Sequence, residues 1–312
     1  MKLIVKTIEG LEKVTIDEIK EKLKVNSKKI TKGVVYFESN KLKELRSVNT
    51  IYELISKFRF KNKNDLINKT KKIKFNIKND FVVRCDREGD HKFSSLELEK
   101  DIGEVIYEQG NKVNLKSENI IYVDIIEDYC FIGRLISKDL CKREYKLRIS
   151  QNTINGCLGY SLLKLANYKK NENLVDPLCK DGVILIEAGL IGGKKLFGLD
   201  NNLYHIENSN VNSKLAKVKL NLIDENLNFL EKKFKKKSVD KIITSVFVYT
   251  KNKQKSIDKI KELIRYSKPI LKKNLVLLSN INLDKYKDKF ILKSKIKIKI
   301  GENNFIIHIL GI

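Results

Sequence analysis

The strongest constraint on the fold is a regular alternation of strand-like and helix-like segments from about residue 150 to the C-terminus. Such alternation is typical of βαβ units and predicts a parallel, doubly wound α/β sheet. Segments 289–300 and 303–312 alternate Lys with Ile and then turn at Gly301-Glu302, which predicts an antiparallel hairpin at the sheet edge. The expected strands are 173–177, 195–200, 218–224, 240–248 and 274–280, and the expected helices are 151–168, 182–193, 205–218 and 255–272.

The first half of the chain has a different pattern, which predicts two smaller α+β units. Residues 1–60 carry strand-like segments at 1–10 and 33–39 and helical patterns at 11–25 and 42–60. In the second of these units, Ser94 and Glu97 form a capping box at the start of a helix. Its expected helices are 65–75 and 94–110, and its expected strands are 80–86 and a hairpin over 120–137 that turns at Glu127-Asp128.

A loop with acids and a glycine follows the first expected strand of the C-terminal unit. Asp176 ends that strand, Gly182 precedes the next helix, and Asp200 ends the following strand. In an open parallel sheet, ligands bind outside the carboxyl ends of the strands where strand order reverses, and an acid on the second strand accepts hydrogen bonds from a ribose diol. The spacing therefore predicts a Rossmann-like nucleoside site. The alternative is structural, with Asp176 capping a helix and Asp200 in a turn.

The charge balance favours a polyanionic partner. The chain has 64 Lys and Arg against 39 Asp and Glu, a formal net charge of +25. Phosphate contacts made by such a surface release counterions, so we expect contact with nucleic acid. The alternative is that many lysines are simply solvated and reflect the Lys-, Ile- and Asn-rich composition of the chain.

Cysteine and histidine are too scattered to predict a metal site. The five cysteines have no CxxC spacing and the three histidines lie far apart, so we expect no zinc, no disulfide framework, and reduced, mostly buried thiols. No apolar run reaches the roughly 18 residues that a membrane span needs. The N-terminus lacks the features of a signal peptide. The sequence therefore predicts a cytoplasmic protein with no membrane partner and no metal.

The loop belongs to a longer motif. Residues 176–188, DPLCKDGVILIEA, resemble the D-P-x-C-G-S-G-T-x-x-I-E-A motif of class I S-adenosylmethionine-dependent RNA methyltransferases, and residues 142–168 resemble the segment that precedes that motif. The resemblance implies S-adenosyl-L-methionine as the cofactor. The cofactor-binding residues that it implies are Asp176, Cys179, Gly182 and Asp200, with Asp224 as a weaker match near the third strand.

Residues 81–106 resemble the THUMP RNA-binding domain, which shows F-x-V-R, then G-x-H-x-F-S-S-x-E and I-G. The opening segment TIEGLEKVTIDEIKEKL looks like the ferredoxin-like module that precedes THUMP. Nearly the whole chain is thus similar, in the same order, to the archaeal and bacterial group that methylates guanine N2 in tRNA or rRNA. The implied domains are a ferredoxin-like module at 1–60, a THUMP-like RNA-binding domain at 61–141 and a Rossmann-like methyltransferase domain at 142–312.

Polar and cationic side chains around the THUMP-like motif are the expected RNA contacts. They surround Gly89 and the start of the next helix, where cations and a helix N-terminus favour phosphate, and they continue into the junction before the methyltransferase-like unit. We expect tRNA as the bound RNA; the alternative is that these charges are solvated. The residues are Arg84, Arg87, His91, Lys92, Ser94, Lys142, Arg143 and Lys146.

Two departures from the family motifs bear on activity. Lys180 replaces the first loop glycine and Asp181 replaces a small polar residue. The family carries [D/N]-P-P-[Y/F] after the fourth strand, where it holds the target amine and stacks on the base. The aligned segment here is Ser245-Val246-Phe247-Val248, so Ser245 and Phe247 stand at the positions of the catalytic motif.

The sequence therefore predicts a tRNA-binding protein whose S-adenosyl-L-methionine site is weak or lost and which is catalytically impaired or noncatalytic. A catalytic protein partner is a candidate for such a chain. The alternative is an active S-adenosylmethionine-dependent tRNA (guanine-N2) methyltransferase with a diverged active site.

Overall fold

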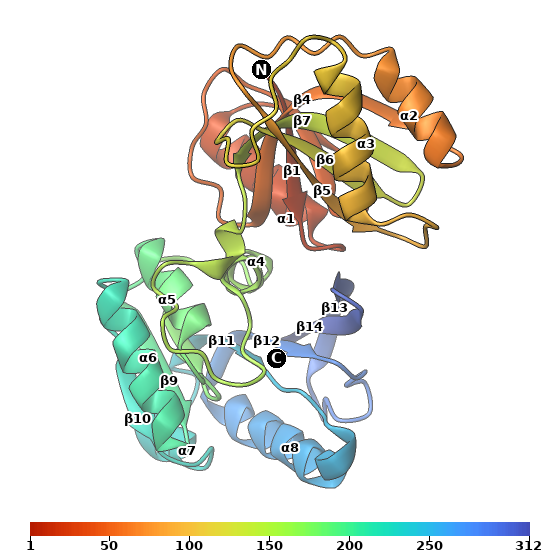
Figure 1. Cartoon of the computed structure of the whole chain (residues 1–312). Coiled ribbons are helices and arrows are strands. Elements are labelled where there is room, and N and C mark those ends of the chain that lie inside the picture. Colours follow the sequence, from red (N-terminus) through yellow and green to blue (C-terminus); the bar gives the residue numbers. More distant parts are fainter. The chain divides into compact units, whose positions relative to one another are not determined.

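The computed structural model describes residues 1–312 and divides the chain into two compact units. The first unit comprises Met1–Thr7, Ile16–Glu44 and Val48–Asp139, and the second comprises Ile8–Thr15, Leu45–Ser47 and Leu140–Ile312. Each unit is built around its own seven-stranded sheet (Figure 1). Two short stretches of the first 60 residues therefore belong to the C-terminal unit.

The sheet of the first unit has the strand order β2-β3-β1-β4-β7-β6-β5. Neighbouring strands are antiparallel except β5 and β6, which are parallel. Helices α2 and α3 pack on one face through a shared apolar cluster. The elements are β1 (Lys2–Thr7), α1 (Glu12–Leu23), β2 (Ser27–Thr31), β3 (Val34–Glu38), β4 (Val48–Arg59), α2 (Lys63–Lys71), β5 (Val82–Glu88), α3 (Ser95–Tyr107), β6 (Ile120–Ile126) and β7 (Tyr129–Ser137).

The helix expected over residues 42–60 is wrong, because this segment forms the long strand β4. It pairs with β1 on one side and β7 on the other. The register with β7 shifts between Ile51 and Tyr52 and again between Leu54 and Ser56. Such bulges interrupt the two-residue alternation of a strand, so the apolar spacing imitates a helix. The β-branched and aromatic residues of the segment suit a strand.

Other local predictions for this unit are confirmed. Ser94 caps α3 by accepting a hydrogen bond from the Glu97 amide, and the Glu97 side chain accepts one from the Ser94 amide, which completes the capping box. Strands β6 and β7 form an antiparallel hairpin that turns at Glu127-Asp128. The strands on both sides of residue 60 share one sheet; a domain boundary at this residue stays a prediction.

The second unit has the strand order β10-β9-β8-β11-β12-β14-β13. The first five strands in this order are parallel, and β14 and β13 add an antiparallel edge hairpin, as the sequence predicts. The elements are a short 3₁₀ turn (Leu140–Lys142), α4 (Gly156–Leu165), β8 (Asn173–Asp176), α5 (Val183–Leu190), β9 (Lys195–Asp200), α6 (Leu203–Leu215), β10 (Asn221–Asp224), α7 (Phe229–Lys233), β11 (Val239–Ser245), a second 3₁₀ turn (Thr250–Asn252), α8 (Lys253–Ile270), β12 (Leu271–Ser279), β13 (Ile291–Ile300) and β14 (Asn303–Gly311).

Helices cover both faces of this sheet, so its central strands are buried on both sides. Successive residues of β8 show this, since Leu174 belongs to the apolar cluster with α4 and α5, and Val175 to the cluster with α8. The unit is therefore a doubly wound, Rossmann-like α/β domain. Strand β8 lies between β9 and β11, where the strand order reverses, so the loop after β8 leaves the sheet at the position favoured for ligands.

One prediction about the cysteines is wrong. Cys141 and Cys157 form a disulfide with a Cα–Cα distance of 5.0 Å, whereas Cys85, Cys130 and Cys179 are free and buried. The pairing joins the 3₁₀ turn at 140–142 to the first turn of α4 and has no spacing signature in the sequence.

No helix is both long enough and apolar enough to cross a lipid bilayer.

Candidate functional site

The loop between β8 and α5 makes a tight, left-handed turn. Lys180 has a φ of 49° and Gly182 a φ of 79°, a region that glycine adopts at little cost and other residues adopt rarely. A Cβ on Gly182 would lie 3.0 Å from the Ser209 hydroxyl, so the close approach of α6 also requires a glycine. The Ser209 hydroxyl donates to the Lys180 carbonyl at 2.7 Å and holds the turn against α6.

Buried carboxylates gather at this turn. Asp176, Asp181 and Asp200 are each no more than 3% exposed. Burial raises the pKa of Asp176 to about 7. It also raises the pKa of Asp181, which accepts a hydrogen bond from Thr153 and lies 3.9 Å from the Lys146 ammonium. The loop therefore brings three carboxyl groups together at the switch point of the sheet, and burial favours the neutral forms of Asp176 and Asp181.

Asp200 is already engaged by its own unit. Its carboxylate accepts hydrogen bonds from the backbone amides of Lys180 at 3.1 Å and Asn202 at 3.2 Å, and it lies 3.0 Å from Nδ1 of His205. These contacts place it next to the turn, as expected for a ribose-binding acid. A ribose diol bound at this position would share the Asp200 carboxylate with the His205 ring.

The other implied cofactor residues are placed differently. Cys179 is buried against the Gly198 backbone, and burial raises the pKa of its thiol well above the usual range. Asp224 is exposed at the end of β10. A pocket of about 520 Å³ lies beside these strand ends. It is lined by Leu178, Leu199, Asn201, Glu225, Asn226, Leu227, Gln254, Lys255, Asp258, Lys259 and Glu262.

The Lys180 side chain crosses the loop and contacts two other segments. Its ammonium donates to the Asn152 carbonyl at 2.7 Å and lies 4.9 Å from the centre of the Phe247 ring. Phe247 in turn packs edge-on against Phe305 at 5.4 Å. Burial lowers the pKa of Lys180. Two of the motif positions that depart from the family pattern, 180 and 247, are therefore in contact.

The segment after β11 is held by the core and by one asparagine. Ser245 and Val246 are buried, and the Val246 amide donates to the Leu278 carbonyl. The Asn280 side chain accepts from the Val248 amide at 2.8 Å and donates to the Val248 carbonyl at 2.9 Å. The backbone polar groups of Val248 are thus satisfied within the protein.

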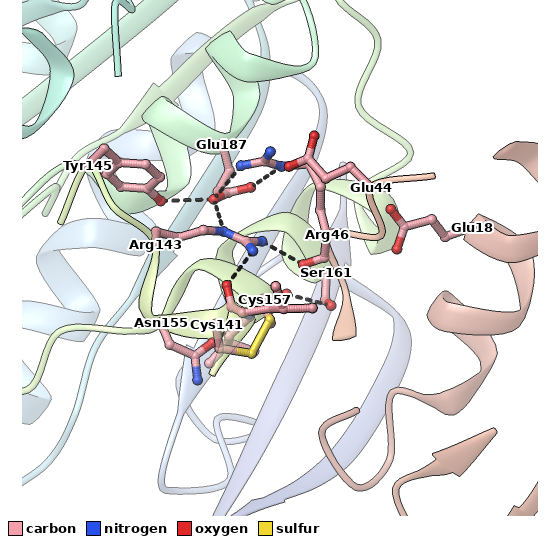
Figure 2. A network of polar contacts seen from close by, with 12 residues as sticks. Glu18, Glu44, Arg46, Cys141, Arg143, Tyr145, Asn155, Cys157, Ser161 and Glu187 are labelled. Carbon is pink, nitrogen blue, oxygen red and sulfur yellow. Dashed lines mark hydrogen bonds and ion pairs between the residues drawn. A yellow bond between two sulfur atoms is a disulfide. The ribbon is translucent and has the colours of Figure 1, made fainter. Parts of the chain in front are cut away.

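A second polar centre, which sequence reasoning missed, surrounds Glu187 of α5 (Figure 2). Arg46 binds both oxygens of the carboxylate at 2.7 and 3.0 Å. Arg143 donates to it at 2.8 Å and the Tyr145 hydroxyl at 2.9 Å. Glu187 is fully buried. In the sequence it is the single acid inside the apolar helix VILIEAGL. An acid at such a position indicates a buried charge, which requires partners.

This centre engages one of the residues expected to contact RNA. The Arg143 side chain is 8% exposed and donates also to the carbonyls of Leu140 and Arg46. Lys146 is similarly enclosed, with a side chain 9% exposed whose ammonium donates to the Ile154 carbonyl. Lys142, in contrast, is exposed. The two enclosed cations hold residues 140–146 within the second unit.

In the first unit, the structure brings Arg87 and His91 together beside the turn at Gly89. Arg87 donates to the Gly89 carbonyl at 3.0 Å and contacts Nδ1 of His91 at 3.1 Å. Nε2 of His91 lies 2.7 Å from the Glu127 carbonyl, which assigns the ring proton to Nε2. The His91 ring stacks on Phe93 with centroids 5.0 Å apart. Lys92 is exposed next to this cluster.

Arg84 lies apart from that cluster. Its guanidinium contacts Glu99 at 3.5 Å and the Leu115 carbonyl at 3.3 Å. With Ser94 it borders an apolar pocket of about 740 Å³ whose lining includes Glu97, Glu99 and Glu104. The charge of Arg84 therefore faces carboxylates. No group of histidine, cysteine and acidic side chains in the protein is arranged to hold a metal ion.

Two family models match this chain. Residues 46–134 match the THUMP domain, and residues 143–246 match the RMKL-like methyltransferase domain. Fold and motifs define a class I methyltransferase-type protein with an added THUMP domain. The chain therefore carries a THUMP domain followed by an RMKL-like methyltransferase domain, in the order that its motifs predict.

Curated relatives and solved structures agree with this assignment. A tRNA (guanine(6)-N2)-methyltransferase of Methanocaldococcus jannaschii is 27% identical over 206 residues, which are 58% of this chain and 54% of the relative. A tRNA (guanine(10)-N2)-dimethyltransferase of the same organism is 35% identical over 142 residues, or 40% of each chain. The chain thus spans about half the length of these relatives, or less. TrmN from Thermus thermophilus has the same fold, with a TM-score of 0.80 over 99% of both chains at 20% identity.

Proposed function

We propose that this protein binds tRNA and does not transfer a methyl group to it. Its similarity to enzymes named as tRNA guanine-N2 methyltransferases and its THUMP domain support tRNA as the ligand. The formal net charge of +25 supports binding to a polyanion. The Arg87–His91 cluster, next to the start of α3, is the phosphate-binding surface that we propose for the first unit.

The contact between Lys180 and Phe247 is the observation that carries the noncatalytic part of the proposal. S-adenosylmethionine is a sulfonium cation, and its methionine end would approach the turn after β8. Here that turn carries a fixed ammonium group, held by the Asn152 carbonyl and the Phe247 ring. Like charges repel strongly where water is excluded. The chain's residues therefore suit the nucleoside half of the cofactor better than its sulfonium half.

The segment after β11 supports the same proposal. Catalysis on an exocyclic amine relies on acceptors that position the amine and stabilise developing positive charge. The Val248 carbonyl, which could serve as such an acceptor, receives a hydrogen bond from Asn280, so only one of its two lone pairs remains for a target amine. Ser245 is buried at the end of β11. We derive no methyl-transfer step from this arrangement.

A second candidate function, an active S-adenosylmethionine-dependent tRNA methyltransferase, is favoured by other features of the same loop. Asp200 keeps the position of a ribose acceptor, and the pocket of about 520 Å³ lies beside it. Incubation of the protein with unmodified tRNA and labelled S-adenosylmethionine separates the two functions. The proposal expects tRNA binding without incorporation of label, whereas stoichiometric incorporation would establish the second candidate.

A further inference from the structure

The pocket of about 520 Å³ at the strand ends of the second unit has the features of a base-binding site. Leu178, Leu199 and Leu227 supply apolar walls. The side-chain amides of Asn201 and Asn226 also line it, and the first donates to the second at 3.1 Å. This bond leaves the Asn226 amino group as a donor and the Asn201 carbonyl as an acceptor for a ligand. Apolar walls with a few directed polar groups suit a purine base.

An acid that fits a ribose adjoins this pocket. Asp200 ends β9, and Asn201 of the pocket lining follows it directly. The Asp200 carboxylate is held by the backbone amides of Lys180 at 3.1 Å and Asn202 at 3.2 Å. An acid at the end of the second strand of a doubly wound sheet accepts hydrogen bonds from a ribose diol. The pocket and the acid together therefore fit a ribonucleoside.

Two half-buried ammonium groups lie near this acid. Lys259 of α8 lines the pocket and has no hydrogen bond or ion pair in the protein. The Lys180 ammonium donates to an uncharged acceptor, the Asn152 carbonyl. Burial lowers the pKa of Lys180, and the charge of Lys259 lowers it further. An anion between the two groups would relieve this repulsion and favour the charged form of both.

The carboxyl groups that face Lys180 from the turn are each compensated within the protein. Burial raises the pKa of Asp176 to about 7, so near neutral pH much of it carries no charge. Asp181 accepts a hydrogen bond from Thr153 and lies 3.9 Å from the Lys146 ammonium. Asp200 is held by two backbone amides and by His205 at 3.0 Å. The attraction between these groups and Lys180 therefore leaves the ammonium able to bind an anion.

The other acids of the pocket lining lie in solvent. They are Glu225, Asp258 and Glu262, and all three residues are exposed. Water and salt screen their charges, and Asp258 also lies 3.5 Å from the Lys261 ammonium. Charges in the less solvated part of the site interact more strongly with a ligand, and there Lys180 and Lys259 are both positive.

We propose that this site binds a purine ribonucleoside 5′-phosphate, with the base in the pocket, the ribose on Asp200 and the phosphate between Lys180 and Lys259. This inference rests on the noncatalytic part of the proposed function and names a ligand for the same site. Ammonium groups bind phosphate through charge-assisted hydrogen bonds. The fixed cation that repels a sulfonium group is thus the group that selects an anionic nucleotide.

Titration calorimetry with adenosine, AMP and S-adenosylhomocysteine tests the ligand. We expect AMP to bind about tenfold more tightly than adenosine or better, since a charge-assisted contact accounts for a difference of this order. Lys180→Met and Lys259→Met should each lower the affinity for AMP about tenfold. Their affinity for adenosine should stay unchanged, which also shows that the variants are folded. Lys180→Arg keeps the charge and should keep most of the preference for AMP.

Two controls separate the parts of the site. Lys232→Met removes an exposed lysine of α7 in the same unit and should bind AMP as the unchanged protein does. The deoxyribose form of AMP lacks the 2′-hydroxyl and should bind about fivefold more weakly to the unchanged protein, because Asp200 loses one donor.

Four results would overturn the inference. They are no binding of AMP at millimolar concentration, equal affinities for adenosine and AMP, an equal loss for both ligands in the two lysine variants, or tighter binding of S-adenosylhomocysteine than of AMP. Methyl transfer to tRNA would instead overturn the proposed function. A protein that binds tRNA, transfers no methyl group and fails to bind AMP would overturn this inference alone, so the two failures are distinguishable.

Discussion

The Lys180 ammonium lies 4.9 Å from the centre of the Phe247 ring. This contact joins the turn after β8 to the segment after β11, the two places where a class I methyltransferase holds its cofactor and its target base. A cation over an aromatic ring is stabilising, more so when partly desolvated. Both partners stand at positions that depart from the family motif, so the two changes form one local interaction.

Removing the charge of Lys180 should raise the affinity for a cationic ligand more than the affinity for a ligand without that charge. Lys180→Met keeps the length of the side chain and removes its charge. We expect S-adenosylmethionine to bind about tenfold more tightly to this variant, because a like charge is removed from the loop. S-adenosylhomocysteine, which lacks the sulfonium charge, should gain less. Titration calorimetry with both ligands measures the difference.

Lys232→Met serves as the control, since Lys232 is exposed on α7 in the same unit. Its binding of both ligands should equal that of the unchanged protein. Micromolar binding of S-adenosylmethionine by the unchanged protein would contradict the repulsion between the Lys180 ammonium and the sulfonium group.

Loss of the Glu187 carboxylate should destabilise the second unit strongly. Glu187→Gln leaves Arg46 and Arg143 enclosed without their common counter-charge. Removing one partner of a buried ion pair costs about 3–5 kcal/mol. We expect a loss of this order in the free energy of unfolding, measured by urea denaturation. Glu231→Gln, at an exposed glutamate of the same unit, should change it by less than about 0.5 kcal/mol.

Stability should fall with rising pH because of Asp176. Burial raises its pKa from 3.8 to about 7, so the folded protein holds this proton more tightly than the unfolded chain does. The contribution is therefore fully present below about pH 4 and is lost as the pH rises through 7. Asp176→Asn should flatten this part of the stability profile by up to about 4 kcal/mol. Parallel profiles for the two proteins would show that Asp176 has no raised pKa.

The Cys141–Cys157 bond can be tested by counting thiols. Alkylation of the denatured protein should label three cysteines without a reductant and five after treatment with a dithiol. Reduction opens a loop with a sequence separation of 16 residues, so the free energy of unfolding should fall by about 3 kcal/mol. Five labelled thiols in protein purified without reductant would contradict the pairing.

The second unit could be predicted well from sequence because its signals are local. Each strand from 173 to 280 is a short apolar run between helical patterns, and Asp176 and Gly182 lie at the strand end and helix start that their spacing indicates. The capping box at Ser94 and Glu97 could also be predicted, since it depends on two residues three positions apart.

The features that escaped prediction depend on residues far apart in the chain. Strand β4 pairs with β7 across 70 to 86 residues, and bulges interrupt its alternation. The helix predicted over residues 42–60 includes Arg59, so the position of its guanidinium over the Tyr129 ring could not be predicted. Arg46 and Glu187 are 141 residues apart in the sequence, and no local sequence pattern indicates a contact between such distant residues. The contact of Lys180 with Phe247 likewise requires the folded sheet.

The most direct test of the account measures tRNA binding and methyl transfer on one sample. Unmodified tRNA is titrated with the protein until binding saturates, labelled S-adenosylmethionine is added, and nucleosides from the digested tRNA are analysed for label. We expect salt-sensitive, saturable binding with no labelled nucleoside above the level of a protein-free control. A labelled N2-methylguanosine at a yield that grows with protein concentration would contradict it.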